Sequence, residues 1–248
     1  MHALRWSITL TILVALAYAV FVAIRFHHVD TRVYAWASQL LQGGAPPSVA
    51  PGGRRLDSYQ LDAPPLKVQG VDRNLSGLTF DAETRTLLSV VNRPARLVRL
   101  SLEGKVIAQH RLLHAADVEG VTYVGQGRVA LLEEGRNRVV LAALPSAPDA
   151  EIDLADTFAL TLSMDPPSGT ASGVLASNAG FEGIGYDHAK DALYVVKEHS
   201  PRALYRIGGL ASYTPGKALR VSIDNLSEWV GNASVVGTDL SSVEVDPA

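Results

Sequence analysis

The sequence predicts an all-β domain built from repeated units and placed behind one N-terminal transmembrane helix. Three observations carry this prediction: an unbroken apolar run at residues 8–24, short strand-like runs separated by turn residues from about Asp57 onwards, and one seven-residue pattern that returns along this second region. The composition excludes cysteine-based sites and argues against nucleic-acid binding. Cysteine is absent, which excludes disulfides and thiolate ligands, and a net charge of -3 provides no basic surface for nucleic acid.

The apolar run reads ITLTILVALAYAVFVAI and predicts a transmembrane anchor, which we assign to residues 1–28. At ~1.5 Å per residue, the run and its flanks nearly cross the ~30 Å hydrocarbon layer of a bilayer. The alternative is a cleaved signal peptide with Ala17-Tyr18-Ala19 as its cleavage site, but the apolar run continues well past Ala19. Both interpretations place the remainder of the chain across the membrane.

Residues 29–56 predict a juxtamembrane helix followed by a linker. Val33, Trp36 and Leu40 would lie on one stripe of such a helix. Proline and glycine crowd residues 43–55 (GGAPPSVAPGGRR) and prevent regular structure there. We therefore expect the folded β domain to occupy residues 57–248.

Beyond residue 57, short apolar runs alternate with turn residues, which is typical of β-hairpins. Three hairpins are expected, from residues 87–91 with 96–102, 129–132 with 139–144, and 193–196 with 204–207. Another strand should begin at Val106, after the turn at Glu103-Gly104. Residues 163–178 are rich in glycine, proline and serine and are expected to form a loop between strands.

One short pattern recurs through this region and predicts a β-propeller. Its copies are residues 74–80 (NLSGLTF), 117–123 (DVEGVTY), 180–186 (GFEGIGY) and, in degenerate form, 239–245 (DLSSVEV). They lie roughly 40 to 65 residues apart, and a four-stranded propeller blade takes ~40–50 residues before loops are added. A single unit cannot bury its own faces, so the units must stack around an axis. One aromatic position of the repeat should pack between the blades, namely Phe80, Tyr123 and Tyr186.

These motifs also carry a resemblance to a known family. Residues 74–80, Val91-Asn-Arg-Pro94, Asp117-Val-Glu-Gly120, Gly180-Phe-Glu-Gly183 and Lys197-Glu198 resemble the SdiA-regulated, or YjiK-like, family, and the likeness extends from about Val68 to the end of the chain. The resemblance implies a five-bladed β-propeller, distantly related to NHL-repeat propellers. It further implies display from the bacterial inner membrane into the periplasm and the binding of calcium. It implies no established biochemical activity.

The chain departs from the family pattern at its C-terminus. Family members continue beyond residues 239–247 with the rest of that blade and a closing blade, whereas this sequence stops at Ala248. We therefore expect an incomplete ring of about four blades, with two exposed sheet edges and an open core face.

Four glutamates are the candidate metal ligands. In a propeller the first strand of each blade lines the axis, and Glu119 and Glu182 stand at the start of that strand in successive repeats. The second strand runs back antiparallel, so Glu134 and Glu198 at its end should return to the same mouth. Clustered carboxylates repel one another unless a cation joins them, and hard oxygen ligands at flexible spacing favour Ca²⁺. Two amides are possible further ligands, Asn74 and Asn92.

Two functional hypotheses remain open. The first is a binding scaffold, a calcium-stabilised platform whose channel mouth receives a small molecule or a protein partner. The second is a calcium-dependent hydrolase of lactones or esters, by analogy with other propellers. Hydrolysis needs a general base beside the metal, and no histidine falls at a predicted channel-lining position, which favours the scaffold.

Two other motifs give weaker signals. His110 and His114 have the i,i+4 spacing of a zinc site, but their context is strand-like rather than helical. The pair Gly125-x-Gly127 lacks the third glycine and the following helix of a dinucleotide-binding loop. Neither motif therefore predicts a site.

Overall fold

The chain is described by a computed structural model that covers residues 13–22, 59–62, 64–71, 73–155, 157–162, 180–198, 203–210, 213–214, 217, 220–227 and 241–245. It divides into two compact units, residues 1–62 with 233–238 and residues 63–232 with 239–248. The expected linker at 43–55 and the expected loop at 163–178 lie outside the described residues.

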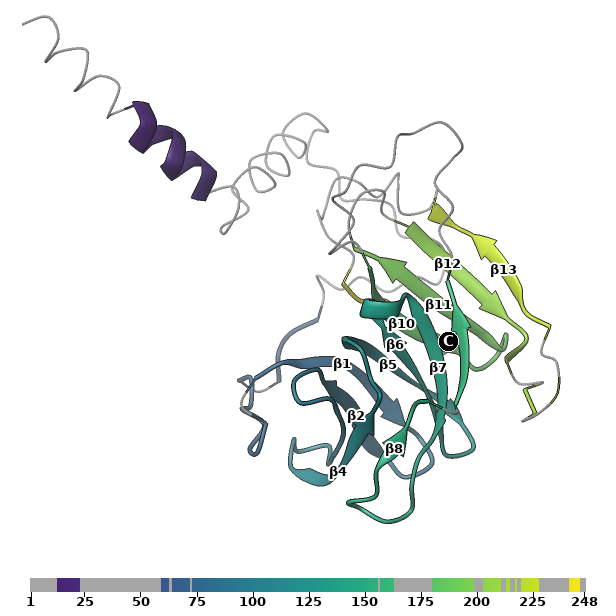
Figure 1. Cartoon of the computed structure of the whole chain (residues 1–248). Helices are drawn as coiled ribbons and strands as arrows, with labels where there is room; N and C mark the ends of the chain where they lie inside the picture. Colours follow the sequence, from purple (N-terminus) through teal and green to yellow (C-terminus); the bar gives the residue numbers. More distant parts are fainter. Residues whose placement is uncertain are drawn as a thin grey trace, which may run out of the picture. The chain divides into compact units, whose positions relative to one another are not determined.

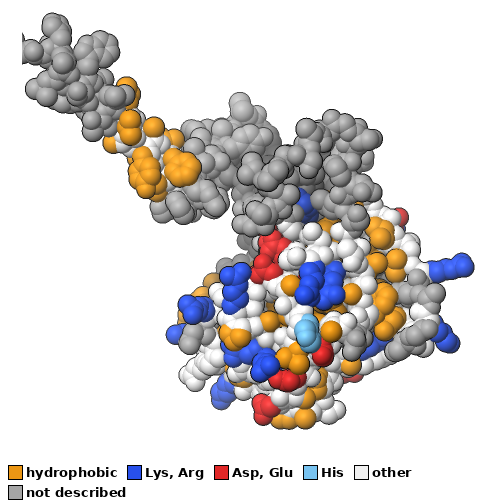
Figure 2. All heavy atoms as spheres, in the orientation of Figure 1, with side chains coloured by type: hydrophobic (Ala, Val, Ile, Leu, Met, Phe, Trp, Pro, Cys, Tyr) orange, Lys and Arg blue, Asp and Glu red, His pale blue; other side chains and the backbone are white. Residues whose placement is uncertain are grey.

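In the first unit, residues 13–22 form a helix inside the predicted apolar segment. Its large apolar side chains are exposed, and Figure 2 shows them in orange along the helix. No helix in the described part of the chain is both long and apolar enough to cross a bilayer.

The described residues of the second unit form three antiparallel sheets (Figure 1). The first contains β1 (Leu75–Asp81), β2 (Thr86–Val91), β3 (Arg96–Leu100) and β4 (Val106–Leu113), and β8 (Ile152–Asp153) pairs with β4 in parallel. The second contains β5 (Val118–Gly125), β6 (Arg128–Glu133), β7 (Arg138–Ala143) and β9 (Phe158–Thr161), with a 3-10 turn η2 (Glu134–Arg136) between β6 and β7. The third contains β10 (Phe181–Asp187), β11 (Ala192–Lys197), β12 (Ala203–Gly208) and β13 (Ser222–Asn225).

Strand β6 shows why the sequence contains short runs that are apolar throughout. Val129 and Leu131 pack with residues of the first sheet, whereas Ala130 and Leu132 pack with residues of the third. Successive side chains of a strand point to opposite faces, so a sheet that lies between two others must be apolar on both. All four side chains are fully buried. The sheets therefore stack face to face, as the blades of a propeller do.

The first strands of the sheets lie next to one another, and glycines allow this close approach. A Cβ atom on Gly77 of β1 would lie 3.0 Å from the backbone nitrogen of Val121 in β5. A Cβ atom on Gly120 of β5 would lie 2.8 Å from the Cγ2 atom of Ile184 in β10. A larger residue at either glycine would force the neighbouring strand away.

The same packing continues to the fourth copy of the repeat. A Cβ atom on Gly183 of β10 would lie 2.7 Å from the Cα atom of Ser242, and one on Gly185 would lie 2.6 Å from the carbonyl oxygen of Val243. Residues 241–245 therefore lie beside β10 as β10 lies beside β5. The first strands of successive repeats thus follow one another around a common axis, and the predicted all-β propeller fold is confirmed.

The expected hairpins are confirmed as β2–β3, β6–β7 and β11–β12. The expected packing of the aromatic position is confirmed for Tyr123, which is 3% exposed, and for Tyr186, which packs against the core between the second and third sheets. For Phe80 the expectation is wrong, because this side chain is 46% exposed. Leu75 and Leu78 of β1 are exposed too, since no sheet among the described residues covers that side of β1.

The close approach of β1 and β5 predicts that Gly77→Ala destabilises the domain more than Gly104→Ala. Both glycines have positive φ, 57° and 76°, so both changes cost roughly 1–2 kcal/mol of backbone strain. Only Gly77 is crowded, because a Cβ on Gly104 would meet nothing within 4 Å. Overpacking should therefore add roughly 1–3 kcal/mol at Gly77, measured by urea unfolding of the full chain. Equal losses in the two variants would contradict the packing of β1 on β5.

Candidate functional site

A β-bulge marks the start of each first strand. The pairing register skips one residue at the beginning of β1, β5 and β10. In β1 the skipped residue is Gly77, and in β5 and β10 it is a glutamate, Glu119 and Glu182. A bulge removes one residue from the hydrogen-bonded ladder and turns its side chain to a new direction. The two glutamates are thus set apart from the regular strand by the backbone itself.

The structure brings the four predicted glutamates together at one end of the first strands. We call this group the carboxylate mouth (Glu119, Glu134, Glu182 and Glu198). All four side chains are half-buried. The negative charges of the other three all act on Glu182, and a side-chain hydrogen bond joins Glu182 to Glu198. The predicted geometry holds because β5 and β10 begin at this end, whereas β6 and β11 finish there.

Burial and nearby negative charges raise the pKa of two carboxyl groups of the mouth, Glu182 and Glu134. Burial, followed by the charges of Glu134, Glu198 and Glu119, raises the pKa of Glu182 to about 8 from its ordinary value of 4.5. Burial, followed by the charge of Asp117, also raises the pKa of Glu134. A pKa near 8 favours the protonated form of Glu182 at neutral pH, in which its hydroxyl can donate the hydrogen bond to Glu198.

Two adjacent glutamates at the end of β6 have different surroundings. Glu134 accepts a hydrogen bond from the backbone N–H of Gly180, and a Cβ atom at Gly180 would overlap the Glu134 side chain. Glu133 is fully buried, accepts a hydrogen bond from the backbone nitrogen of Ala116 at 2.6 Å, and pairs with Arg138. Glu133 therefore holds the hairpin in place, and Glu134 belongs to the mouth.

An amide and a further carboxylate lie beside the mouth. The Nδ2 atom of Asn92 donates hydrogen bonds to Asp117 and, at 2.7 Å, to Oε1 of Glu119. The guanidinium group of Arg93 lies 3.7 Å from Asp117. Asp117 is not among the ligands predicted from the sequence, although it shares its repeat position with Asn74. Both residues have positive φ, 56° and 58°, a conformation that Asp and Asn tolerate. Asn74 itself is exposed.

The oxygen donors at the carboxylate mouth are of the type that calcium binds. Carboxylate and amide oxygens are the ligands that Ca²⁺ takes in proteins, and a divalent cation would offset the repulsion that raises the pKa of Glu182. In the described part of the chain, however, no group of three or more His, Asp or Glu side chains is arranged to hold a metal ion. Instead, Asn92 donates to Glu119, and Glu182 bonds to Glu198.

The described histidines lie away from the mouth. His110 is buried in β4, with Nδ1 3.0 Å from the carbonyl oxygen of Ala150. His114 pairs with Asp153 at 2.7 Å, so His110 and His114 have different partners. His188 follows β10, at the other end of that strand. None of these three imidazoles is placed to act as a general base at the carboxylate mouth.

The raised pKa of Glu182 predicts a dependence of stability on pH. The folded chain binds this proton more tightly than the unfolded chain, so in the presence of a chelator Tm should fall as pH rises from about 5 to about 8 and level off above it. Glu182→Gln should remove most of this fall, as measured by thermal unfolding across pH. Glu103→Gln, which changes an exposed turn residue, is the control that should retain it. An unchanged slope in Glu182→Gln would contradict the clustering.

Three solved structures are similar to this chain. The β-propeller domain of Cps50 (Swd1) from Myceliophteria thermophila is 18% identical, with a TM-score of 0.36 over 59% of this chain and 42% of that one. A protein of unknown function from Bacteroides caccae is 9% identical, with a TM-score of 0.38 over 60% and 45%. Hydrazine synthase from Kuenenia stuttgartiensis is 10% identical, with a TM-score of 0.35 over 68% and 52%. The chain spans about half the length of each of these structures.

The comparison with protein families is more specific than the comparison with solved structures. The family model described as SdiA-regulated matches residues 53–248, which includes all three sheets and the fourth copy of the repeat. The likeness read from the repeat motifs is thereby confirmed, and the chain belongs to the SdiA-regulated family.

Proposed function

We propose that this β-propeller is a calcium-binding scaffold whose carboxylate mouth receives a ligand or a protein partner. One observation carries the proposal: four glutamates from two successive sheets lie close together, and burial, followed by the charges of the other three, raises the pKa of Glu182 to about 8. A fold that gathers like charges without a cation is destabilised by them. Conversely, a divalent cation bound at the mouth would replace repulsion by attraction and would stabilise the folded state.

The proposed ligands are the four glutamates, with Asn92 and Asp117 beside them. Each would contribute oxygen atoms, and calcium accepts six to eight of them in variable geometry. Since the mouth is half-buried, a bound cation would remain reachable from solvent. An oxygen-bearing ligand or an acidic loop of a partner could then complete its coordination. The described histidines do not lie at the mouth, so the alternative of hydrolysis gains no support from them.

Calcium should raise the thermal stability of the full chain in mild detergent. A ligand that binds only the folded state stabilises it by about 2.7 kcal/mol at a hundredfold excess over Kd, which corresponds to roughly 5–10 °C in Tm for a domain of this size. Magnesium at the same concentration should have a smaller effect, because it requires a more regular octahedral site.

Substitutions at the mouth distinguish specific binding from a general salt effect. Glu182→Gln and Glu119→Gln should each reduce the calcium-induced rise in Tm by half or more, because each removes a carboxyl group that a bound cation would hold in its ionised form. Glu103→Gln should respond to calcium like the unaltered chain. A Tm that calcium leaves unchanged, or an equal response in all variants, would sink the proposed site.

We also propose that residues 1–28 anchor the domain in the bacterial inner membrane, with the propeller facing the periplasm. Two observations support the anchor: the apolar run at residues 8–24, and the helix at 13–22, whose large apolar side chains are exposed in their own unit of the structure. An exposed helix without a polar face is typical of a segment that lies in lipid.

The anchor predicts that the full chain stays in the membrane pellet after washing with alkaline carbonate. Leu13→Arg combined with Val20→Arg should release it, since arginine at the centre of a membrane helix costs roughly 2.5–3.5 kcal/mol. Leu66→Arg combined with Leu102→Arg is the matched control, because both residues are exposed in the second unit. Recovery of the unaltered chain in the soluble fraction, or an N-terminus after Ala19, would contradict the anchor.

A further inference from the structure

A pocket of about 240 Å³ opens at the opposite end of the first strands from the carboxylate mouth. It lies between the second and third sheets, where β5 and β10 finish. Strand β5 runs from Glu119 near the mouth to Gly125 at the pocket, which at ~3.3 Å per residue is roughly 20 Å. The pocket is therefore separate from the proposed calcium site.

The turn between β5 and β6 forms one wall of the pocket and is held from two sides. Gly125, Gln126 and Gly127 all have positive φ, 86°, 55° and 61°. The backbone nitrogen of Gln126 donates to Oε1 of Glu83 at 2.8 Å, and that of Gly127 donates to the hydroxyl of Tyr123 at 3.1 Å. A left-handed backbone is uncommon for glutamine and persists where the surroundings enforce it, often at ligand sites. The backbone of the turn that carries Gln126 is thus fixed by these two hydrogen bonds.

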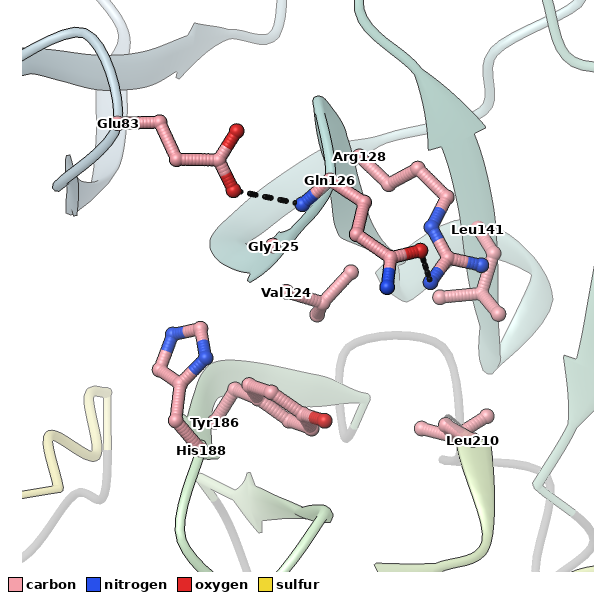
Figure 3. A pocket seen from close by; sticks show the side chains of 9 residues that line it. All are labelled: Glu83, Val124, Gly125, Gln126, Arg128, Leu141, Tyr186, His188 and Leu210. Atoms are coloured by element: carbon pink, nitrogen blue, oxygen red, sulfur yellow. Dashed lines mark hydrogen bonds between the residues drawn. The ribbon is translucent and has the colours of Figure 1, made fainter. Parts of the chain in front are cut away.

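Arg128 supplies the positive charge of this wall. One guanidinium nitrogen, Nη2, donates to Oε1 of Gln126 at 3.2 Å. Its Nε atom is buried and has no hydrogen-bond partner among the described residues. A guanidinium group carries five N–H donors in one plane, so Arg128 retains donors for a ligand. Figure 3 shows Gln126 and Arg128 together on one side of the open space.

The opposite wall is aromatic. Tyr186 donates its hydroxyl hydrogen to Oδ1 of Asp191 at 2.7 Å, which fixes the ring. The imidazole of His188 packs edge-on against this ring, at 4.7 Å between centroids and 80° between planes. Figure 3 shows both rings across the open space from Arg128. The remaining side chains of the lining are the apolar Val124, Leu141 and Leu210, together with Glu83, whose Oε1 atom accepts the hydrogen bond from the backbone of Gln126.

We propose that this pocket binds a small monocarboxylate with a flat aromatic body, held by Arg128 and Gln126 at the carboxylate and by Tyr186 at the ring. A planar guanidinium matches a carboxylate with two parallel hydrogen bonds, and an aromatic side chain packs favourably against a flat ring. The volume equals that of roughly eight liquid waters, which suits a ligand of about ten non-hydrogen atoms. This inference does not depend on calcium.

Benzoate and benzamide test the proposal on the full chain in mild detergent, with detergent alone as the reference. Saturation-transfer NMR should detect benzoate binding, with a Kd on the order of 1 mM for so small a ligand. Benzamide has the same shape without the charge and should bind at least tenfold more weakly. Equal binding of the two compounds, or no binding of benzoate at 20-fold this concentration, would overturn the proposal.

Substitutions of two arginines test where benzoate binds. Arg128→Met should weaken benzoate binding at least tenfold. Arg96→Met is the control, because Arg96 also has a buried Nε without a partner but lies in the first sheet, bonded to Gln109. It should bind benzoate normally. Retained binding in Arg128→Met would overturn the site, and if this variant does not fold, the comparison of benzoate with benzamide decides.

Discussion

The second sheet must bury two apolar faces, and the rest of this structure depends on that constraint. β6 presents Val129 and Leu131 to one neighbouring sheet and Ala130 and Leu132 to the other, so neither face tolerates water. Stacking satisfies both faces, so the clusters on the two sides of this sheet are apolar. Asp81 and Glu133 are buried charged groups at the ends of β1 and β6, and each of them pairs with an arginine, Arg99 and Arg138.

Because the first strands run in the same direction around the axis, a residue type at one repeat position is brought to one end of the domain. Glu119 and Glu182 meet in this way, and Glu134 and Glu198 return to them along the second strands. The other end collects the turns after β5 and β10, where an arginine and two aromatic rings face each other. The two ends therefore differ in chemical character, although both follow from the same repeat.

Much of this arrangement could be predicted from the sequence, because hairpin spacing and the repeat pattern fix strand direction without knowledge of tertiary structure. That information was sufficient to place four glutamates at one mouth. It was not sufficient to separate Glu133 from Glu134, since the inward direction of Glu133 depends on Arg138 and on the backbone of Ala116. The sequence pattern also could not predict why residue 180 is a glycine, because the reason is the close approach of the Glu134 side chain. Nor could the pattern show that Phe80 lies on a face that no described sheet covers.

The bulges at the start of β5 and β10 have a consequence for how such a protein can change over generations. A residue in a regular strand has its direction set by the pleat, so altering it disturbs a core position or its neighbours across the ladder. Glu119 and Glu182 are skipped by the pairing register, and their replacement leaves the ladder on either side intact. The residues at the mouth can therefore change during evolution while the packing that holds the sheets together stays the same.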